Sequence, residues 1–92
     1  EEEEAQEALA EGDTGTALEK LQHAVVTDPA NDDARFDYVK LLLQLGREDD
    51  AKVAFAPVIA KAAMSRKLGA LKAWMDALDF VAKDLLLSNV LP

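Results

Sequence analysis

The chain has 92 residues, of which 50% are hydrophobic and 5% aromatic, and it contains no cysteine, so disulfides, thiolate metal sites and thiol redox chemistry are excluded within it. Its net charge of −8 is the sum of an acidic half, residues 1–50, and a basic half, residues 51–92. The chain lacks the dense cationic face that nucleic-acid binding requires. No apolar run approaches the roughly 20 residues of a membrane span, and the acidic start does not resemble a signal peptide, so we expect a cytoplasmic protein.

The first half of the sequence predicts two helices. The first runs from the acidic start to about Glu11, because carboxylates are stabilised near a helix N-terminus. A glycine turn follows, and Asp13 or Thr14 can cap a second helix over about 14–27. Pro29 then interrupts the chain, because proline lacks a backbone donor and restricts the residue before it.

The middle of the chain predicts another pair of helices. The third covers about 31–45, capped by Asn31 or Asp32, and ends at Gly46. The fourth covers about 48–63 and contains Pro57, which should either bend this helix or split it; we predict a kink.

The last predicted helix covers about 65–85 and has apolar residues at alternating spacings of three and four, the pattern of a bundle helix. In a helical array these residues are core of a capping helix, and the alternative is a dimer interface. The apolar tail from Leu86 to Pro92 either folds back or docks on a neighbour. The residues of the possible self-association surface are Leu68, Leu71, Met75, Leu78 and Leu85.

Small and apolar positions recur at a fixed spacing along the chain. Gly12 and Ala17 return as Gly46 and Ala51, and a set of small and apolar positions in residues 5–24 matches residues 39–58 in register. A period of about 34 with a glycine turn between two helices is typical of a helical repeat array.

The stretch Asp28-Pro29-x4-Ala34-Arg35 leading through Leu41-Leu42-x3-Gly46-Arg47-x3-Ala51 resembles tetratricopeptide repeats. The likeness covers about residues 5–60. It implies an all-α solenoid, one domain over 1–92, with repeats at about 1–30 and 31–63 and a capping helix and tail at about 65–92. Because the first copy begins late, we expect a fragment of a longer chain.

More narrowly, the run from Asp28 to Ala51, followed by a basic stretch and a Leu/Trp-rich helix, looks like the C-terminal module of bacterial thioredoxin-like co-chaperones. The carboxylate clamp of some tetratricopeptide domains needs asparagine and lysine where this chain has Gln6, Phe36 and Asp37, so that specificity is not expected. The resemblance implies that the first helix of each pair lines a groove for a partner. The residues expected there are Gln6, Leu9, Asp33, Phe36, Lys40, Leu43 and Gln44, with Phe36 as an apolar anchor or simply packed on the adjoining helix.

Catalytic and metal-binding chemistry is not expected. His23 is the only histidine, and neither a second imidazole nor a cysteine could complete a zinc site. The paired carboxylates Asp32-Asp33 and Asp49-Asp50 lie at helix starts, where capping explains them. The sequence therefore predicts a protein–protein interaction module without cofactor, for a partner protein, unfolded client or chaperone; the alternative is a homodimer formed through the C-terminal helix and tail.

Overall fold

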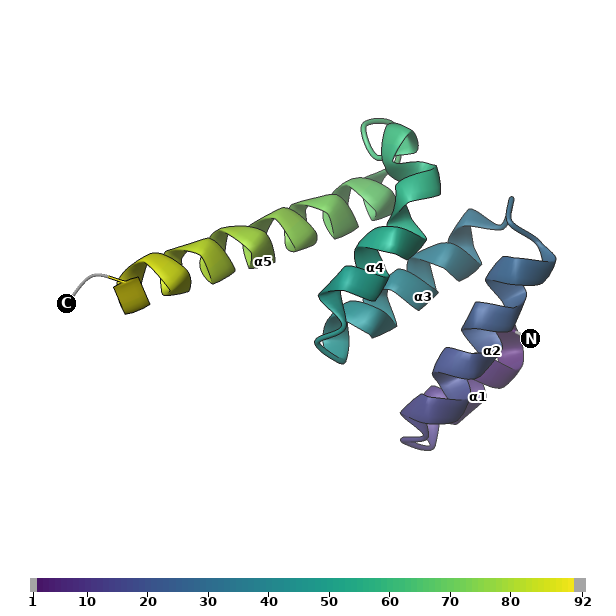
Figure 1. The fold of residues 1–92 in the computed structure, drawn as a ribbon. Helices are drawn as coiled ribbons and strands as arrows, with labels where there is room; N and C mark the ends of the chain where they lie inside the picture. The colour runs from purple at the N-terminus through teal and green to yellow at the C-terminus, as the bar shows by residue number, and fades with distance from the viewer. Residues whose placement is uncertain (1, 91–92) are drawn as a thin grey trace.

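The computed structural model describes the backbone of residues 2–90 and the side chains of residues 3–83. Over those residues the chain is helical and contains no strand (Figure 1). Two helical hairpins stack side by side, and a long C-terminal helix packs on the second one. This arrangement confirms the predicted all-α solenoid. The elements are α1 (Glu2–Ala10), α2 (Thr14–Thr27), α3 (Asp32–Gln44), α4 (Glu48–Phe55), the 3-10 helix η1 (Ala56–Lys61) and α5 (Arg66–Val90).

The turn inside each hairpin has the same geometry in both repeats. Gly12 and Gly46 adopt φ of 80° and 78°, a left-handed conformation that costs glycine little. The N–H of Asp13 then donates to the Ala8 carbonyl at 2.8 Å, and one repeat later Arg47 donates to Leu42 at the same distance. These bonds satisfy carbonyls at the helix C-terminus.

Side-chain caps begin two of the helices. An Asp13 carboxylate oxygen accepts from the Thr16 N–H at 3.1 Å at the start of α2. The Asn31 amide oxygen accepts from the Ala34 N–H, also at 3.1 Å, at the start of α3. Each bond satisfies an N–H that the helix itself leaves unpaired, and in each case the residue is one of the two predicted caps.

The fourth helix is split, not kinked. Its α-helical part ends at Phe55, and the chain continues as the 3-10 helix η1 with Pro57 in its first turn. Proline has no N–H to donate to Val53, so the α-helical ladder cannot continue through this point. The predicted helix over 48–63 is therefore two shorter elements, and the predicted kink is wrong in form.

The Arg35 side chain supplies a hydrogen-bond donor for a carbonyl that this break leaves without its helical partner. In a continuous α-helix the Ala54 carbonyl would accept from the N–H of Val58. In a 3-10 helix the donor would be the preceding residue, Pro57, which has no N–H. In the structure Nη1 of Arg35 donates to the Ala54 oxygen at 2.8 Å, and Nη2 donates to the Pro29 oxygen at 3.5 Å. Arg35 is only 7% exposed, and its Nε has no partner among the described residues.

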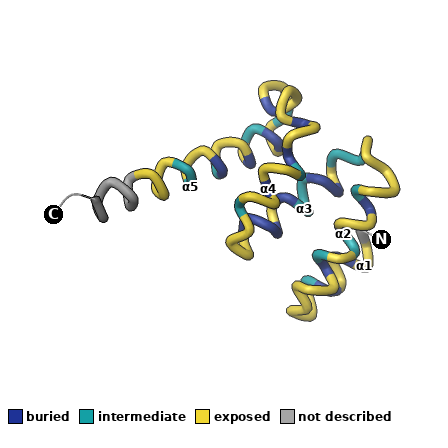
Figure 2. The backbone as a smooth tube through the Cα atoms, viewed as in Figure 1, coloured by how far each residue is buried: buried dark blue, intermediate teal, exposed yellow. Residues whose placement is uncertain are grey.

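The core consists of two clusters that differ in side-chain size. Figure 2 shows the buried positions along the helices. The first lies among α1, α2 and α3 and is built largely from alanines, which allow close helix packing. The second, formed by α3, α4, η1 and α5, contains the larger side chains and therefore most of the buried apolar area. The members of this larger core cluster are Val39, Leu42, Leu43, Ala51, Phe55, Val58, Ala62, Leu68, Leu71 and Met75.

α5 is longer than predicted. It runs from Arg66 to Val90 instead of over 65–85, so most of the predicted apolar tail is helical backbone. Its first half packs on α3 and η1, and its second half projects beyond the hairpins (Figure 1), giving a molecule of 50 × 31 × 19 Å. The predicted packing of the tail concerns side chains 84–90 and residues 91–92, which lie outside the described part.

Candidate functional site

The first helices of successive repeats lie side by side in register. Lys67 on α5 contacts the Asp33 carboxylate on α3 at 3.4 Å, one 34-residue period apart. Gln6 on α1 donates to the Asp37 carboxylate on α3 at 3.2 Å. Repeat-equivalent positions on α1, α3 and α5 therefore occupy one surface, here called the first-helix face. Its residues are Gln6, Asp33, Phe36, Asp37, Lys40, Gln44, Lys67 and Trp74.

A hollow of about 190 Å³ lies on this face between α1 and α3. Four of the seven predicted groove residues line it, which shows that the repeat register brings together side chains far apart in the sequence. Asp37 and Leu41 complete its wall and were not among the predicted residues. The predicted residues in the hollow are Gln6, Leu9, Lys40 and Gln44.

Lys40 is the cation of this hollow. Its side chain is exposed, and it makes no ion pair within the described part of the chain. The neighbouring Asp37 accepts a hydrogen bond from the amide of Gln6. An ammonium group that lies beside a hollow and makes no ion pair within residues 3–83 is available to an anionic group of a partner.

Asp33 and Phe36 lie outside the hollow, nearer the start of α3, and contact α5. Phe36 is half-buried against the larger core cluster, and Nζ of Lys67 lies 5.3 Å from the centroid of its ring. Lys67 therefore combines a cation–π contact with its ion pair to Asp33. Phe36 packs on the adjoining helix, as one of the two interpretations predicted, and the part of its side chain that stays exposed remains open to a partner.

Leu43 was predicted to line the groove and does not. It is 5% exposed and belongs to the larger core cluster. The sequence interpretation placed it on the open face of α3, but three consecutive leucines, 41 to 43, cover more than one side of a helix and all are buried. Leu43 is therefore a packing residue.

Trp74 belongs to the face and was missed. It lies one period after Lys40, which itself lies one period after Gln6, so the three hold the same position in successive first helices. Trp74 is half-buried, packed against the larger core cluster. Extending the repeat by one more period, into the capping helix, would have found it.

The predicted self-association surface is mostly interior. Leu68, Leu71 and Met75 are 3%, 2% and 7% exposed and form part of the larger core cluster, and Leu78 is half-buried against it. Leu68, Leu71 and Met75 are therefore core, as the capping-helix interpretation predicts, and these three side chains are not available to a second chain. The side chain of Leu85 lies outside the described residues.

A second open groove lies on another side of α5, between α5 and the α4–η1 segment. It encloses about 330 Å³, and we call it the terminal groove. Its apolar floor includes Ile59, which is 53% exposed. Two ion pairs border it: Lys52 with Asp79 at 2.7 Å, which joins α4 to α5, and Lys72 with Asp76 at 2.8 Å.

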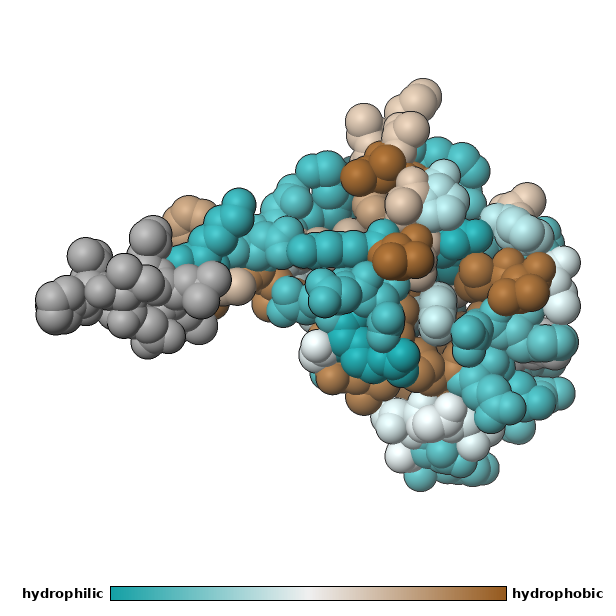
Figure 3. All heavy atoms as spheres, viewed as in Figure 1, coloured by the Kyte–Doolittle hydropathy of each residue, from teal (hydrophilic) through white to brown (hydrophobic). Residues whose placement is uncertain are grey.

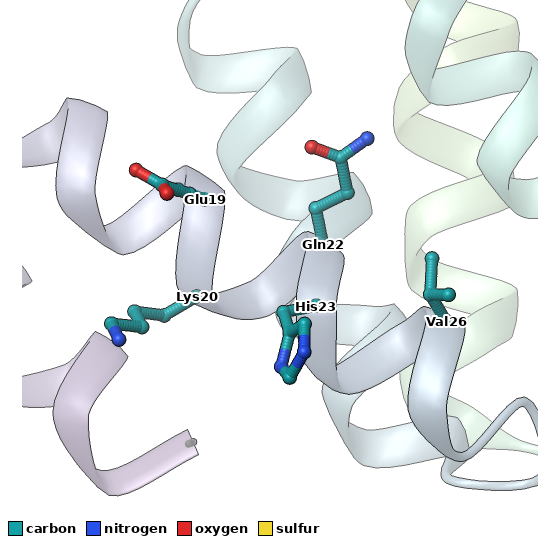
Figure 4. A pocket seen from close by; sticks show the side chains of 5 residues that line it. All are labelled: Glu19, Lys20, Gln22, His23 and Val26. Atoms are coloured by element: carbon teal, nitrogen blue, oxygen red, sulfur yellow. The ribbon is translucent and has the colours of Figure 1, made fainter.

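His23 lies in a shallow surface hollow of α2 together with Glu19, Lys20, Gln22 and Val26 (Figure 4). All five side chains come from one helix, and in Figure 4 they diverge from it instead of pointing at a common centre. Within the described residues there is no group of three or more His, Asp or Glu side chains placed to hold a metal ion. Nor does any described helix combine the length and apolarity needed to cross a membrane.

The described pKa shifts arise from surface contacts. The pKa of Glu4 is lowered by its hydrogen bond to Lys20, and the pKa of Asp13 by the hydrogen bond from Thr16. The pKa of Lys52 is raised, first by its hydrogen bond to Asp79 and also by the charges of nearby carboxylates. Each shift favours the charged form, as expected for structural ion pairs and caps.

Comparison with protein families matches residues 8–75 to the family model described as tetratricopeptide repeat. The matched region begins at residue 8, near the end of α1, and covers α2, the second hairpin and the start of the capping helix α5. Comparison with curated proteins and with solved structures found no significant similarity.

Proposed function

Because the chain belongs to the tetratricopeptide repeat family, we propose that it is a protein–protein interaction module whose first-helix face binds a segment of a partner protein. The observation that supports this proposal is the hollow between α1 and α3, which is lined by side chains of two successive first helices and includes the exposed Lys40. Stacked repeats present such continuous surfaces because each hairpin adds its first helix to the same side.

The composition of the face supports binding of a peptide segment. It combines a partly exposed aromatic side chain, Phe36, with the available cation of Lys40 and the amides of Gln6 and Gln44. Apolar side chains also reach the surface elsewhere, but on the face drawn in Figure 3 they are interspersed with hydrophilic ones. Binding energy would come from apolar burial at about 25 cal/mol per Å², less the cost of ordering the segment.

The finer proposal is that this module is the client- or partner-binding part of a cytoplasmic, thioredoxin-like co-chaperone. Its support is the resemblance of residues Asp28 to Ala51 and of the Leu/Trp-rich helix that follows. The test is the sequence encoded before Glu1. A thioredoxin-like domain there would support the proposal, and a different domain there would contradict it.

The binding proposal predicts that changes on the first-helix face weaken partner binding without unfolding the protein. A random peptide library is selected on the wild-type chain, and the affinities of the enriched peptides are measured by fluorescence anisotropy. We expect Phe36→Ala and Lys40→Ala each to lower affinity about tenfold or more, as anchors at the centre of an interface do. Circular dichroism should show unchanged helicity.

Two matched variants serve as controls. Val26→Ala removes an apolar side chain, 69% exposed, from α2, and Arg66→Ala removes an exposed cation from the start of α5. Both should leave affinity within about twofold. Peptides whose affinity falls with the control variants but not with the face variants would place the binding surface elsewhere.

A further inference from the structure

The chemistry of the first-helix face changes along the array. At one repeat position the residues from α1 to α5 are Gln6, Lys40 and Trp74, an amide, a cation and an aromatic ring. Four residues later in each helix they are Ala10, Gln44 and Leu78. At these two positions the face is therefore polar at α1, carries the cation of Lys40 at α3 and is apolar at α5. The two carboxylates of the α3 part already have partners, since Asp33 pairs with Lys67 and Asp37 accepts from Gln6.

The apolar end is a strip on α5. Trp74, Leu78 and Val81 are spaced by four and three residues, so they lie on one side of the helix. Trp74 and Leu78 are each half-buried against the larger core cluster, and Val81 is 52% exposed. The inner surfaces of Trp74 and Leu78 are fixed by this packing, and the outer surfaces of all three side chains are open to a ligand.

The cation nearest this strip by register is Lys40. The ion pair between Asp33 and Lys67 shows that these two positions, one period apart on α3 and α5, lie opposite each other. Following the same register for two further turns, we infer that Lys40 is at the level of Trp74. Lys67 is already engaged by Asp33 and by the ring of Phe36, whereas Lys40 has no ion pair within the described part of the chain. One available positive charge therefore borders the apolar strip.

The distance between neighbouring helices determines how many residues separate the two peptide side chains that contact them. Packed helices lie about 8–10 Å apart. A segment in the extended polyproline II conformation advances about 3.1 Å per residue and has three residues per turn, so its side chains return to the same side every three residues. Two side chains on one side of such a segment that reach neighbouring helices should therefore be about three residues apart.

Resting on the proposed function of this face, we propose that its preferred partner is a segment in the extended polyproline II conformation that carries a bulky apolar residue and, three residues away, one aspartate or glutamate. The apolar residue packs on Trp74, Leu78 and Val81, and the carboxylate pairs with Lys40. A single carboxylate is favoured over an acidic run, because the next positions toward α1 include the exposed Glu3 and Glu7.

The test uses three synthetic peptides with the cores Phe-Ser-Gly-Glu, Phe-Ser-Gly-Gln and Ala-Ser-Gly-Glu in Gly/Ser flanks. Trp74 is the only tryptophan of the sequence, so its emission reports directly on the strip. We expect the first peptide to shift this emission and to bind about fivefold or more tightly than either other peptide. The preference for glutamate over glutamine should decline in about 1 M salt, which screens exposed charges.

Two variants assign the contacts. Lys40→Ala should abolish the preference for glutamate over glutamine while retaining the preference for phenylalanine over alanine, and Val81→Ala should weaken every phenylalanine peptide. Arg66→Ala, the matched cation control, should change neither preference. Equal binding of the glutamate and glutamine peptides to the wild-type chain, a preference that survives Lys40→Ala, or no binding of any of the three would overturn the inference.

The failure of this inference is distinguishable from that of the proposed function. If library peptides lose affinity with Phe36→Ala or Lys40→Ala but lack the apolar-x-x-acidic pattern, the face is the binding site and only the assigned chemistry is wrong. If no face variant affects any selected peptide, both proposals fail.

Discussion

The second helix of each repeat forms a groove with the first helix of the following unit, and the two grooves have different surroundings. The interior groove, between α2 and α3, is covered by side chains of α4, whereas its repeat equivalent, the terminal groove, is open. Leu42 in the interior groove is fully buried, and its equivalent one period later is the exposed Asp76. Leu18 is half-buried against the core, and its equivalent is the exposed Lys52.

This difference shows that position in the array, not position in the repeat, decides which side chain is tolerated. A charged side chain at position 42 would be buried without a partner, and the free-energy cost of that burial is far larger than the stabilisation from an apolar contact. At the terminal groove water solvates the charges, and the Lys52–Asp79 pair joins α4 to α5 at 2.7 Å. The helices follow the same register in both places, but one groove is core and the other is surface.

The largest expected effect comes from equivalent truncations in the two grooves. Leu42→Ala removes a fully buried side chain from the larger core cluster and should lower the free energy of unfolding by about 2–5 kcal/mol. Asp76→Ala removes only an exposed partner of Lys72 and should change it by less than about 0.5 kcal/mol. Urea unfolding followed by circular dichroism measures both. Similar losses for the two variants would mean that the terminal groove is buried in solution.

A smaller effect, opposite in sign to helix propensity, is expected at Gly69. A Cβ at this position would lie 2.9 Å from the Ala62 carbonyl oxygen, a backbone atom that cannot move independently. Gly69→Ala gains up to about 1 kcal/mol of helix propensity but must separate α5 from the end of η1. We expect a net loss of about 1 kcal/mol in the free energy of unfolding.

Gly15 is the matched control for this substitution. It lies in the first turn of α2, and the nearest atom to an added Cβ is a carboxylate oxygen of Asp13 at 3.9 Å. Gly15→Ala should therefore leave stability unchanged or raise it. If Gly69→Ala also stabilises the protein in urea unfolding, the close contact between α5 and η1 does not limit packing.

The sequence predicted the elements that depend on local chemistry. Asp13 and Asn31 cap their helices and Gly46 turns the chain, because capping bonds and left-handed backbone involve residues within a few positions. The resemblance to tetratricopeptide repeats also implied four residues of the hollow between α1 and α3.

What the sequence did not predict depends on contacts between distant segments. Leu43 was assigned to the surface, because a run of three leucines does not indicate which of them faces the next helix. The buried Arg35 was not singled out, because its role arises only when the break before Pro57 leaves the Ala54 carbonyl without its α-helical donor. Trp74 was recoverable, but only by extending the repeat into the capping helix.

The smallest expected effect separates the two grooves by their response to pH. The folded-state pKa of Lys52 is raised by Asp79, so this pair contributes stability that is fully present below the unfolded pKa of about 10.5 and is lost as pH rises through the higher folded value. Asp79→Asn should therefore lower Tm slightly between pH 7 and about 9, and the difference from wild type should vanish near pH 11 to 12. The Tm deficit of Leu42→Ala should persist over the same range, because an apolar contact has no proton to lose. A deficit of Asp79→Asn that persists at high pH would show that Asp79 stabilises the terminal groove by packing and not by pairing with Lys52.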